Sequence, residues 1–390
     1  MMEAVPFSEI GEVVAGQGAP RESAFGADGL PFIRAGHLDY LVAGGALYEL
    51  PRISPADAKT FKLKVLPERS VVFAKSGMSA GKDRVVITDQ EAYFVSHLAA
   101  IIPCKDFDAG YIKYFLQWYR PSRLIVDESY PSISLRDIGK VLLPYRPLPT
   151  QRRIAGILDK AQALAANDKR TLALYDQLAK SVFLEMFGDP VRNEREWEKV
   201  TMDSVATKVT DGEHATPRRS EQGYLLLSAR NVKNRFIDLD AGVDFVEKNE
   251  FERIVRRCDP EPGDILISCS GTIGRTTKVR LAQPFVLVRS VALVKPDKKR
   301  IDADYLEQYL LSDYMQATMM KSAKSSSQAN LFTGPIKELP VLLPPMKEQM
   351  KWQTAIRRID SQRAQIETSL RRSEGLFGSL LQGAFGGELV

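Results

Sequence analysis

From Gln151 to Phe187 the chain reads QRRIAGILDKAQALAANDKRTLALYDQLAKSVFLEMF. It contains no proline, and Gly156 is its only glycine, so little in it opposes a continuous helix. Positions spaced alternately by four and three residues are apolar in nine of ten cases. These positions are Ile154, Leu158, Ala161, Ala165, Asp168, Leu172, Tyr175, Ala179, Val182 and Met186. A repeat of 3.5 residues kept over five heptads predicts a coiled-coil seam on a helix roughly 55 Å long.

The same spacing returns near the C-terminal end, where eight of ten positions are apolar. They are Trp352, Ile356, Ile359, Arg363, Ile366, Leu370, Ser373, Phe377, Leu380 and Ala384. Prolines precede both stretches, at Pro149 and Pro345, and glycines follow them, at Gly188 and Gly386. Proline before a helix and glycine after it are the expected boundary signals. The sequence therefore predicts two long helices of similar length.

The two helices belong to a repeat that runs through the whole chain at an offset of 194 to 198 residues. The matching blocks keep one order along the sequence, which chance similarity would not do. They pair Val5–Gly11 with Val200–Ala206, Phe32–Leu38 with Leu226–Val232, Arg69–Gly77 with Gly263–Gly271, Asp108–Ile112 with Asp302–Leu306, Gln151–Arg153 with Gln349–Lys351, and Phe187–Asp189 with Phe385–Gly387.

Each copy begins with a globular part of about 145 residues that mixes short β-branched runs with glycine and proline. Ser70–Ala74 and Asp264–Ser268 are predicted to be buried strands. Ala109–Trp118 and Ala303–Leu311 are predicted to be short amphipathic helices entered through an aspartate turn. The fold class is therefore α/β (α+β mixed), with the order of the strands left open.

These segments predict four domains: residues 1–145 and 191–343 are globular, and residues 146–190 and 344–390 are helical spacers. If the two seams pack on each other and the copies obey a pseudo-two-fold axis, the long coiled-coil helices are antiparallel. They would then separate the two globular domains. The alternative is that each helix packs on its own globular domain.

Composition restricts the class of protein. There is no run of 18 apolar residues to cross a membrane, and no basic region followed by an apolar stretch at the N-terminus, so secretion is not expected. Three cysteines, Cys104, Cys258 and Cys269, do not suggest a disulfide framework; we expect them to be buried, in a protein of the reducing cytoplasm. A net charge of +5 is compatible with nucleic acid.

No catalytic or metal site is predicted. Gly77–Asp83 (GMSAGKD) resembles a phosphate loop but is one residue short between its glycines, and Asp83 stands where a hydroxyl should hold Mg²⁺. The three histidines, His37, His97 and His214, lack metal-ligand spacing. Neither a nucleophile elbow nor an amino-methyltransferase motif is present. We therefore expect no cofactor on this chain.

A candidate DNA-binding loop follows the buried strand in each copy. Residues 265–300 carry eight basic residues and one acid. Glycine lets the backbone approach a phosphate, hydroxyls position the duplex, and arginine can read guanine. The candidates are Ser270, Gly271, Thr272, Arg275, Thr276 and Lys278 in the second copy, and Lys75, Ser76, Gly77, Ser79, Lys82 and Arg84 in the first. The alternative is an ordinary hairpin turn on an exposed surface.

Two further pairs of loops match in position but differ in sequence. Asp211–Arg219 corresponds to Gly16–Arg21, and Ser228–Asn231 corresponds to Arg34–His37. Differences are expected if the two copies read different DNA sequences, and equally if the loops are idle surface. The candidates here are Arg34, His37, His214, Arg230 and Asn231.

Three segments resemble the specificity subunit of type I restriction-modification enzymes. Gly263–Arg275 (GDILISCSGTIGR) is similar to its signature strand and loop, and Leu343–Gln349 and Leu380–Leu389 are similar to the start and end of its second helix. Pro147–Ile154 is a looser version in the first copy, where Lys75–Met78 replaces the Gly-Thr-Ile-Gly run. The resemblance extends over essentially the whole chain.

This resemblance implies a subunit that catalyses nothing. Two target-recognition domains would each read one half of a bipartite site in double-stranded DNA. The helical regions would set the gap and bind two methyltransferase subunits, which hold S-adenosylmethionine, and motor-nuclease subunits could join. Other hypotheses are a fused enzyme with a site between the domains, a protein-binding scaffold or adaptor, and a non-restriction DNA-binding protein of the same fold.

Overall fold

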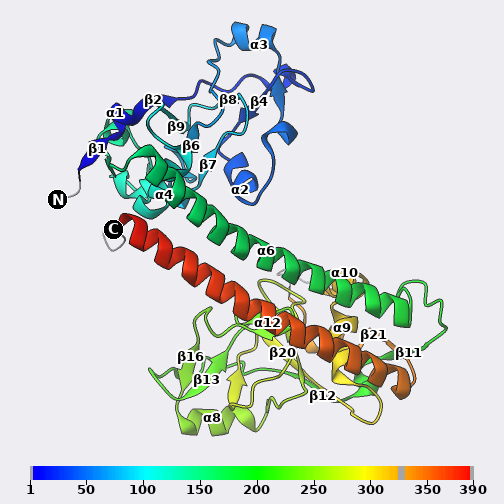
Figure 1. Ribbon diagram of the computed structural model, residues 1–390. Coiled ribbons are helices and arrows are strands. Elements are labelled where there is room, and N and C mark those ends of the chain that lie inside the picture. The colour runs from blue at the N-terminus through cyan, green and yellow to red at the C-terminus, as the bar shows by residue number, and fades with distance from the viewer. Residues whose placement is uncertain (1–2, 324–329, 387–390) are drawn as a thin grey trace. The chain divides into compact units, whose positions relative to one another are not determined.

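The computed structural model describes residues 3–323 and 330–386, and it divides the chain into two compact units (Figure 1). Unit 1 comprises Met1–Lys169 and Thr368–Val390, and unit 2 comprises Arg170–Glu367. Each unit therefore combines one globular domain with half of each long helix. We call the globular parts the first head and the second head. The sequence boundaries separated heads from helices, whereas the compact units join them.

The first head is built around a four-stranded antiparallel sheet in the order β2-β9-β6-β7. A second small sheet has the order β3-β5-β4-β8, in which β4 and β8 are parallel. The strands are β1 Ala4–Pro6, β2 Gly11–Ala15, β3 Phe25–Gly26, β4 Leu30–Ile33, β5 Arg52–Ile53, β6 Val71–Ala74, β7 Val85–Ile87, β8 Tyr93–Phe94, β9 Leu98–Pro103 and β10 Leu142–Pro144. The helices are α1 Phe7–Ile10, α2 His37–Val42, α3 Pro55–Thr60, α4 Ala109–Tyr119 and α5 Leu135–Gly139, with 3₁₀ turns η1 Glu22–Ala24, η2 Leu47–Glu49, η3 Ala80–Lys82 and η4 Pro121–Leu124.

The second head repeats this plan, with a central antiparallel sheet in the order β12-β20-β17-β18. Because corresponding strands take corresponding places, the structure confirms the internal repeat. The strands are β11 Glu198–Thr201, β12 Ala206–Asp211, β13 Tyr224–Leu227, β14 Val232–Lys233, β15 Phe236–Ile237, β16 Asp244–Val246, β17 Ile265–Ser268, β18 Thr276–Lys278, β19 Phe285–Leu287, β20 Val291–Pro296 and β21 Pro340–Leu343. The helices are α7 Met202–Val205, α8 Lys248–Val255, α9 Ala303–Leu310, α10 Asp313–Ala323 and α11 Thr333–Lys337.

The local predictions for strands and short helices are confirmed. All residues of β6 and β17 are buried. The carboxylate of Asp108 accepts the Tyr111 N–H at 3.1 Å, and that of Asp302 accepts the N–H groups of Asp304 and Tyr305, so both helices start on an aspartate N-cap.

The long helices are α6, Leu148–Phe187, and α12, Met346–Phe385. Every predicted seam position on both helices is buried or half-buried. In unit 1 the Asp168 carboxylate accepts the Ser373 hydroxyl at 2.9 Å, and in unit 2 Arg363 pairs with Asp176 at 3.1 Å. Residue numbers rise along one helix as they fall along the other, so the predicted antiparallel pairing is confirmed within each unit.

The long helices also bury side chains against the heads, so the alternative packing is partly correct. In unit 1, Ala155 and Leu158 of α6 join the core around Tyr111. In unit 2, Phe183 of α6 lies with its ring centroid 5.6 Å from that of Tyr305 on α9 and 5.1 Å from that of Trp352 on α12. These contacts fix each half-helix to its head as well as to its partner helix.

Cys258 and Cys269 are buried as expected, but Cys104 is exposed, so that expectation was wrong for one of the three. Among the described residues, no helix is both long and apolar enough to cross a membrane.

Candidate nucleic-acid interface

In the second head, four loops meet at one end of the central sheet, around Ser290. The Cys269 N–H donates to the Ser290 carbonyl at 2.8 Å, and the Ser290 hydroxyl accepts the Ala229 N–H at 3.0 Å. The Glu213 carbonyl accepts the neighbouring Arg289 N–H at 2.9 Å. The loops after β12, β13 and β17 and the turn before β20 therefore form one surface.

The first head gathers the corresponding loops around His97. The Lys75 N–H donates to the His97 carbonyl at 2.9 Å, and the Ser96 N–H donates to the Gln17 carbonyl at 2.8 Å. The Val95 N–H donates to the Ile33 carbonyl at 3.0 Å, which brings in the loop that holds Arg34. The loops matched by sequence thus lie at the same sheet end in both heads, which we call the loop end.

The loop after β17 is closed by Ser268. Its hydroxyl accepts the Arg275 N–H at 2.9 Å and donates to the Thr272 carbonyl, and its carbonyl accepts the Gly274 N–H at 2.9 Å. Gly271 and Gly274 have φ of +71° and +85°, which glycine adopts without strain. Gly271 and Thr272 are exposed and Ser270 is half-buried, so this loop presents backbone and hydroxyl groups outward.

Arg275 is the predicted cation of this loop whose side chain is available to bind DNA. It is half-buried, and its guanidinium makes no hydrogen bond or ion pair with any described residue. Arg230 is exposed but pairs with Asp244 at 3.1 Å. Exposed His214 places Nε2 2.7 Å from the Asp211 carboxylate and 3.0 Å from the Arg257 guanidinium. These contacts hold the side chains of Arg230 and His214 at the loop end.

Three sequence predictions in the second head need correction, because their side chains form the loops from inside. Asn231 is fully buried, accepts the Ser228 N–H and donates to two loop carbonyls. Thr276 is fully buried and donates to the Gly274 carbonyl. Lys278 is mostly buried and pairs with buried Asp304. None of these three offers its side chain to DNA in this structure.

In the first head, Lys75 remains available, because its ammonium has no partner among the described residues. The Ser76 hydroxyl lies 2.9 Å from Nδ1 of His97. Lys82 pairs with Asp39 at 3.1 Å, and Arg84 pairs with the same carboxylate. Gly77 is exposed and Ser79 is half-buried in the same loop. The two C-terminal cations of the loop are thus partly neutralised by α2.

Arg34 and His37 form the neighbouring loop. The Arg34 guanidinium stacks 4.4 Å from the centroid of the Phe25 ring and pairs with Glu22 at 2.9 Å. The Arg34 N–H donates to Nδ1 of His37 at 3.2 Å. Partial burial, and then the positive charge of Arg34, lower the pKa of His37, so this imidazole is neutral at pH 7.

Sequence reasoning missed two residues of the loop end. His97 follows β8 and contacts Ser76, and exposed Arg289 occupies the position of Ser96 in the second head. Comparing the residues just before β9 and β20, which begin directly after these turns, would have identified both.

Below the loop end of the second head, a polar joint attaches the strands to the helices. Arg235, in the turn between β14 and β15, donates to Gln308 of α9 at 2.9 Å and pairs with Asp360 of α12. Buried Glu307 accepts two hydrogen bonds from Arg280, at 2.7 and 2.9 Å, and the Lys278 N–H at 2.6 Å. The basic residues after the loop therefore hold the head on α9 and α12.

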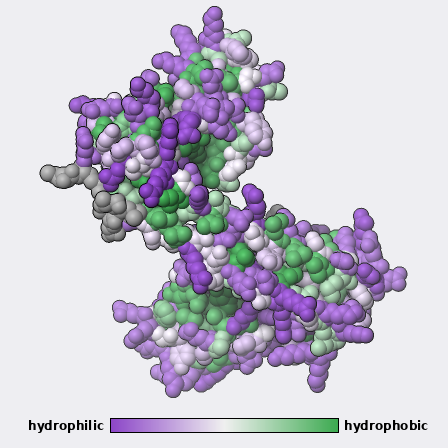
Figure 2. Space-filling view, in the orientation of Figure 1, coloured by the Kyte–Doolittle hydropathy of each residue, from purple (hydrophilic) through white to green (hydrophobic). Residues whose placement is uncertain are grey.

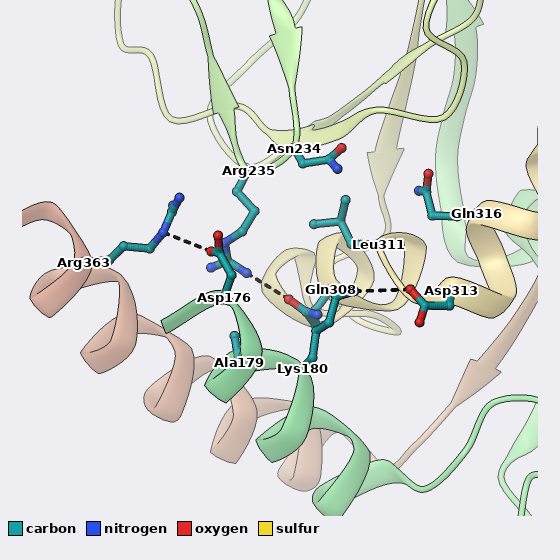
Figure 3. A pocket seen from close by; sticks show the side chains of 10 residues that line it. All are labelled: Asp176, Ala179, Lys180, Asn234, Arg235, Gln308, Leu311, Asp313, Gln316 and Arg363. Atoms are coloured by element: carbon teal, nitrogen blue, oxygen red, sulfur yellow. Dashed lines mark hydrogen bonds and ion pairs between the residues drawn. The ribbon is translucent and has the colours of Figure 1, made fainter. Parts of the chain in front are cut away.

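Figure 3 shows a hollow of about 270 Å³ beside this joint, lined by residues of α6, α9, α10, α12 and the β14–β15 turn. Its charged side chains are paired: Arg363 with Asp176, Lys180 with Asp313, and Arg235 with Asp360. The charges that line the hollow are therefore neutralised by ion pairs within the joint.

In unit 1 the corresponding joint is smaller. The Tyr114 hydroxyl of α4 donates to Asp159 of α6 at 2.5 Å and also lies 3.0 Å from the Gln162 side-chain oxygen, which accepts a hydrogen bond from Lys113. Burial, and then the hydrogen bond to Asp159, raise the pKa of Tyr114, so its hydroxyl stays protonated as a donor.

Helix α6 also exposes apolar side chains that neither its partner helix nor a head covers. They are Ile157 and Leu164 in unit 1, and Leu174, Leu178 and Leu184 in unit 2. Figure 2 shows hydrophobic surface over the later part of α6. Leu174 and Leu178 are one helical turn apart and so lie side by side on the helix surface, and contiguous exposed apolar side chains are typical of a protein-binding surface.

The described residues contain no group of three or more histidine, cysteine or carboxylate side chains arranged to hold a metal ion. Burial raises the pKa of both Cys258 and Cys269 to about 12, so neither thiol is a ready nucleophile at neutral pH.

The family model for the type I restriction modification DNA specificity domain matches residues 2–173 and again residues 194–373. The chain belongs to this family. It is a specificity subunit with two target-recognition domains, and subunits of this kind are non-catalytic DNA-recognition components.

Curated relatives agree with this assignment. The chain is 25% identical over 362 residues to the type I restriction enzyme EcoKI specificity subunit of Escherichia coli strain K12, covering 84% of this chain and 76% of the relative. It is 25% identical over 288 residues to the EcoBI specificity subunit of Escherichia coli, covering 66% of this chain and 60% of the relative.

Solved structures support the fold. The S subunit of a type I restriction-modification system from M. genitalium matches with a TM-score of 0.61 at 13% identity, covering 99% of this chain and 96% of that chain. A chain from work on complex assembly and conformational transition of the type I R-M system matches with a TM-score of 0.55 at 14% identity, covering 98% and 97%.

Proposed function

We propose that each head of this specificity subunit reads one half of a bipartite site in double-stranded DNA through its loop end. The observation that carries the proposal is that both heads present matching loops at the same sheet end, while the side chains on those loops differ. Lys75 and Arg275 are cations without a described partner, and their loops carry the corresponding exposed glycines Gly77 and Gly271. Loops with equivalent backbone positions and different side chains suit the recognition of two different half-sites.

The exposed apolar side chains of α6 support docking of two methyltransferase subunits on the long helices. Those subunits would hold S-adenosylmethionine and modify adenine, and motor-nuclease subunits could join them. The specificity subunit would need no cofactor of its own, and the complex would act in the cytoplasm, where cellular DNA lies. The solved chain from the type I R-M complex assembly work is consistent with such partners.

The test of the reading function is co-expression of the chain with its methyltransferase subunit, followed by sequencing of N6-methyladenine in the host DNA. We expect one bipartite motif with a fixed gap, which disappears when this gene is deleted. A second test uses the Lys75→Ala and Arg275→Ala double variant. We expect the complex with this variant to methylate the motif less than the complex with the native chain does. Methylation unaffected by deletion would contradict the proposal.

The docking surface has its own test. Leu164→Glu and Leu178→Glu place charges at two exposed apolar positions without disturbing a buried contact. We expect each variant to lose copurification with the methyltransferase, because charge is costly at an apolar interface. Lys160→Glu, at an exposed polar position of α6, is the control. Full retention of the partner by both leucine variants would contradict docking on this face.

A further inference from the structure

The segment from Val126 to Tyr130 in the first head combines unusual exposure with a fixed position. Val126 is 98% exposed and Tyr130 is 83% exposed. Neither Glu128 nor Tyr130 makes a side-chain hydrogen bond with a described residue. A tyrosine and a valine this exposed cover no core and support no neighbouring element.

Backbone bonds tie this segment to the candidate DNA-binding loop. The Gly77 N–H donates to the Pro131 carbonyl at 2.9 Å, and the Ile133 N–H donates to the Lys75 carbonyl at 2.7 Å. Ser76 and Ser132 form an isolated antiparallel bridge between these two bonds. The segment is therefore part of the loop end, directly beside Lys75, Ser76 and Gly77.

The far side of the same loop is attached to the element before the segment. Asp83, at the end of the loop, accepts the Ser122 N–H at 2.8 Å and the Ser122 hydroxyl at 2.7 Å. Ile133, directly after the segment, is buried in the core. Residues 126–130 thus lie between two points that are attached to the basic loop, so the segment stays at the loop end while its side chains project into solvent.

The negative charge of the segment disfavours phosphate contact and favours base contact. Asp127 and Glu128 carry negative charge and would be repelled by the DNA backbone. Carboxylates inside a DNA interface instead accept hydrogen bonds from the amino group of cytosine. The Ser129 N–H donates to the Asp127 carboxylate at 2.9 Å, which holds the turn. The tyrosine ring provides apolar contact of the kind that recognises a thymine methyl group.

We propose that residues 126–130 enter a groove of the DNA and that Tyr130 is a specificity-determining residue for the first half-site. The proposal rests on the proposed function of the heads. It adds a reading element that follows η4 and is far in sequence from the basic loop.

The two heads differ at this point. In the second head the Leu331 N–H donates to the Cys269 carbonyl at 2.9 Å, as Ile133 does to Lys75 in the first head. The residues before it, 324–329, read KSSSQA and lie outside the described part of the chain. They contain no aromatic or acidic residue, whereas residues 126–131 read VDESYP. The contact by Tyr130 therefore belongs to the first half-site alone.

The experiment compares Tyr130→Ala with the native chain in the methyltransferase complex, using duplexes that vary each base of both half-sites. We expect Tyr130→Ala to lose roughly 5- to 100-fold discrimination at one or two positions of the first half-site. Discrimination at the second half-site should be unchanged. The salt dependence of binding should also be unchanged, because the ring neutralises no phosphate.

Two controls separate reading from general damage. Tyr130→Phe retains the ring and should retain the discrimination, and its loss would contradict contact through the ring. Tyr145→Ala removes another exposed tyrosine of the first head, just before α6, and should not affect reading. Unchanged discrimination in Tyr130→Ala, or equal weakening on every duplex, would overturn the proposal. A native complex that discriminates at neither half-site would instead overturn the proposed function.

Discussion

In the second head the strand β17 is followed by residues 269–275, a loop that Ser268 of the strand closes, whereas in the first head β6 is followed by residues 75–84, a longer loop that is attached to η4. The longer loop contains the 3₁₀ turn η3 and ends at Asp83, where φ is +49° and the side chain is held by Ser122. The loop after the buried strand thus occupies the same place in both heads, but different contacts stabilise it in each.

The basic residues show what this difference means for function. In the first head Lys82 and Arg84 pair with Asp39 on α2, and in the second head Lys278 pairs with Asp304 on α9. A count of cations overstates the DNA-binding surface of both heads, because several of them hold the head together. Lys75 in the first head and Arg275 in the second have no partner among the described residues and are available to bind DNA.

The largest expected effect concerns the joints between heads and helices. Glu307→Ala would remove the acceptor of the Lys278 N–H and the main ion-pair partner of Arg280, at a site where the Glu307 side chain is 2% exposed. Because Arg280 itself is 38% exposed and keeps its bonds to the Arg235 and Lys278 carbonyls, the cost is below that of a fully buried pair, at about 2–3 kcal/mol. Asp159→Ala in unit 1 removes a carboxylate that is 62% exposed, and Tyr114 can still donate to Gln162, so the cost is about 1 kcal/mol.

Hydrogen exchange of the full chain measures this contrast, because it reports the opening of each unit separately. We expect faster exchange in β17 and β18 for Glu307→Ala and little change in β6 and β7 for Asp159→Ala. Glu307→Gln, which keeps the size and one acceptor, should lie between Glu307→Ala and the native chain. Equal destabilisation of the two units would show that the joints are equivalent.

The next effect concerns the two available cations. Arg275→Ala should lower discrimination at the second half-site by about 1–3 kcal/mol, because arginine can bind guanine through two hydrogen bonds. Lys75→Ala should weaken all duplexes alike and reduce the salt slope by about one, because lysine acts as a point charge on phosphate. Binding assays over a range of salt concentrations distinguish the two results.

Lys347→Ala, an exposed lysine at the start of α12, is the matched control for removal of charge. If Arg275→Ala weakened reading of both half-sites equally, the two heads would not read independently.

The long helices could be predicted from sequence because a heptad pattern repeats through 40 residues and does not depend on distant partners. The short helices with aspartate caps could be predicted for the same local reason. Of the three polar exceptions in the seam, Asp168 and Ser373 bond to each other, and Arg363 pairs with Asp176 on the facing helix. The order of the short strands could not be predicted, since strands of two to six residues carry little register information.

The candidate interface was less predictable, because a side chain's availability depends on partners far away in the sequence. Glycines and strand ends located the loops correctly. The pairing of Lys278 with Asp304, and the burial of Asn231 and Thr276 inside their own loops, arise only from tertiary packing. No local pattern marked Tyr130 as part of the loop end, since the link to Gly77 is a backbone bond to the carbonyl of the next residue, Pro131.

The smallest expected effect tests whether the two loops share one backbone geometry. Gly77 and Gly271 correspond in the repeat, have φ of +74° and +71°, and have no atom within 4 Å of an added Cβ. Alanine at either position should therefore cost about 1 kcal/mol, from backbone strain alone and to the same extent. Thermal unfolding compares the two variants, and Gly→Asn at each site is the control, because asparagine tolerates this conformation better. A markedly larger cost at Gly77 would mean that the first loop constrains its backbone in a way that the second does not.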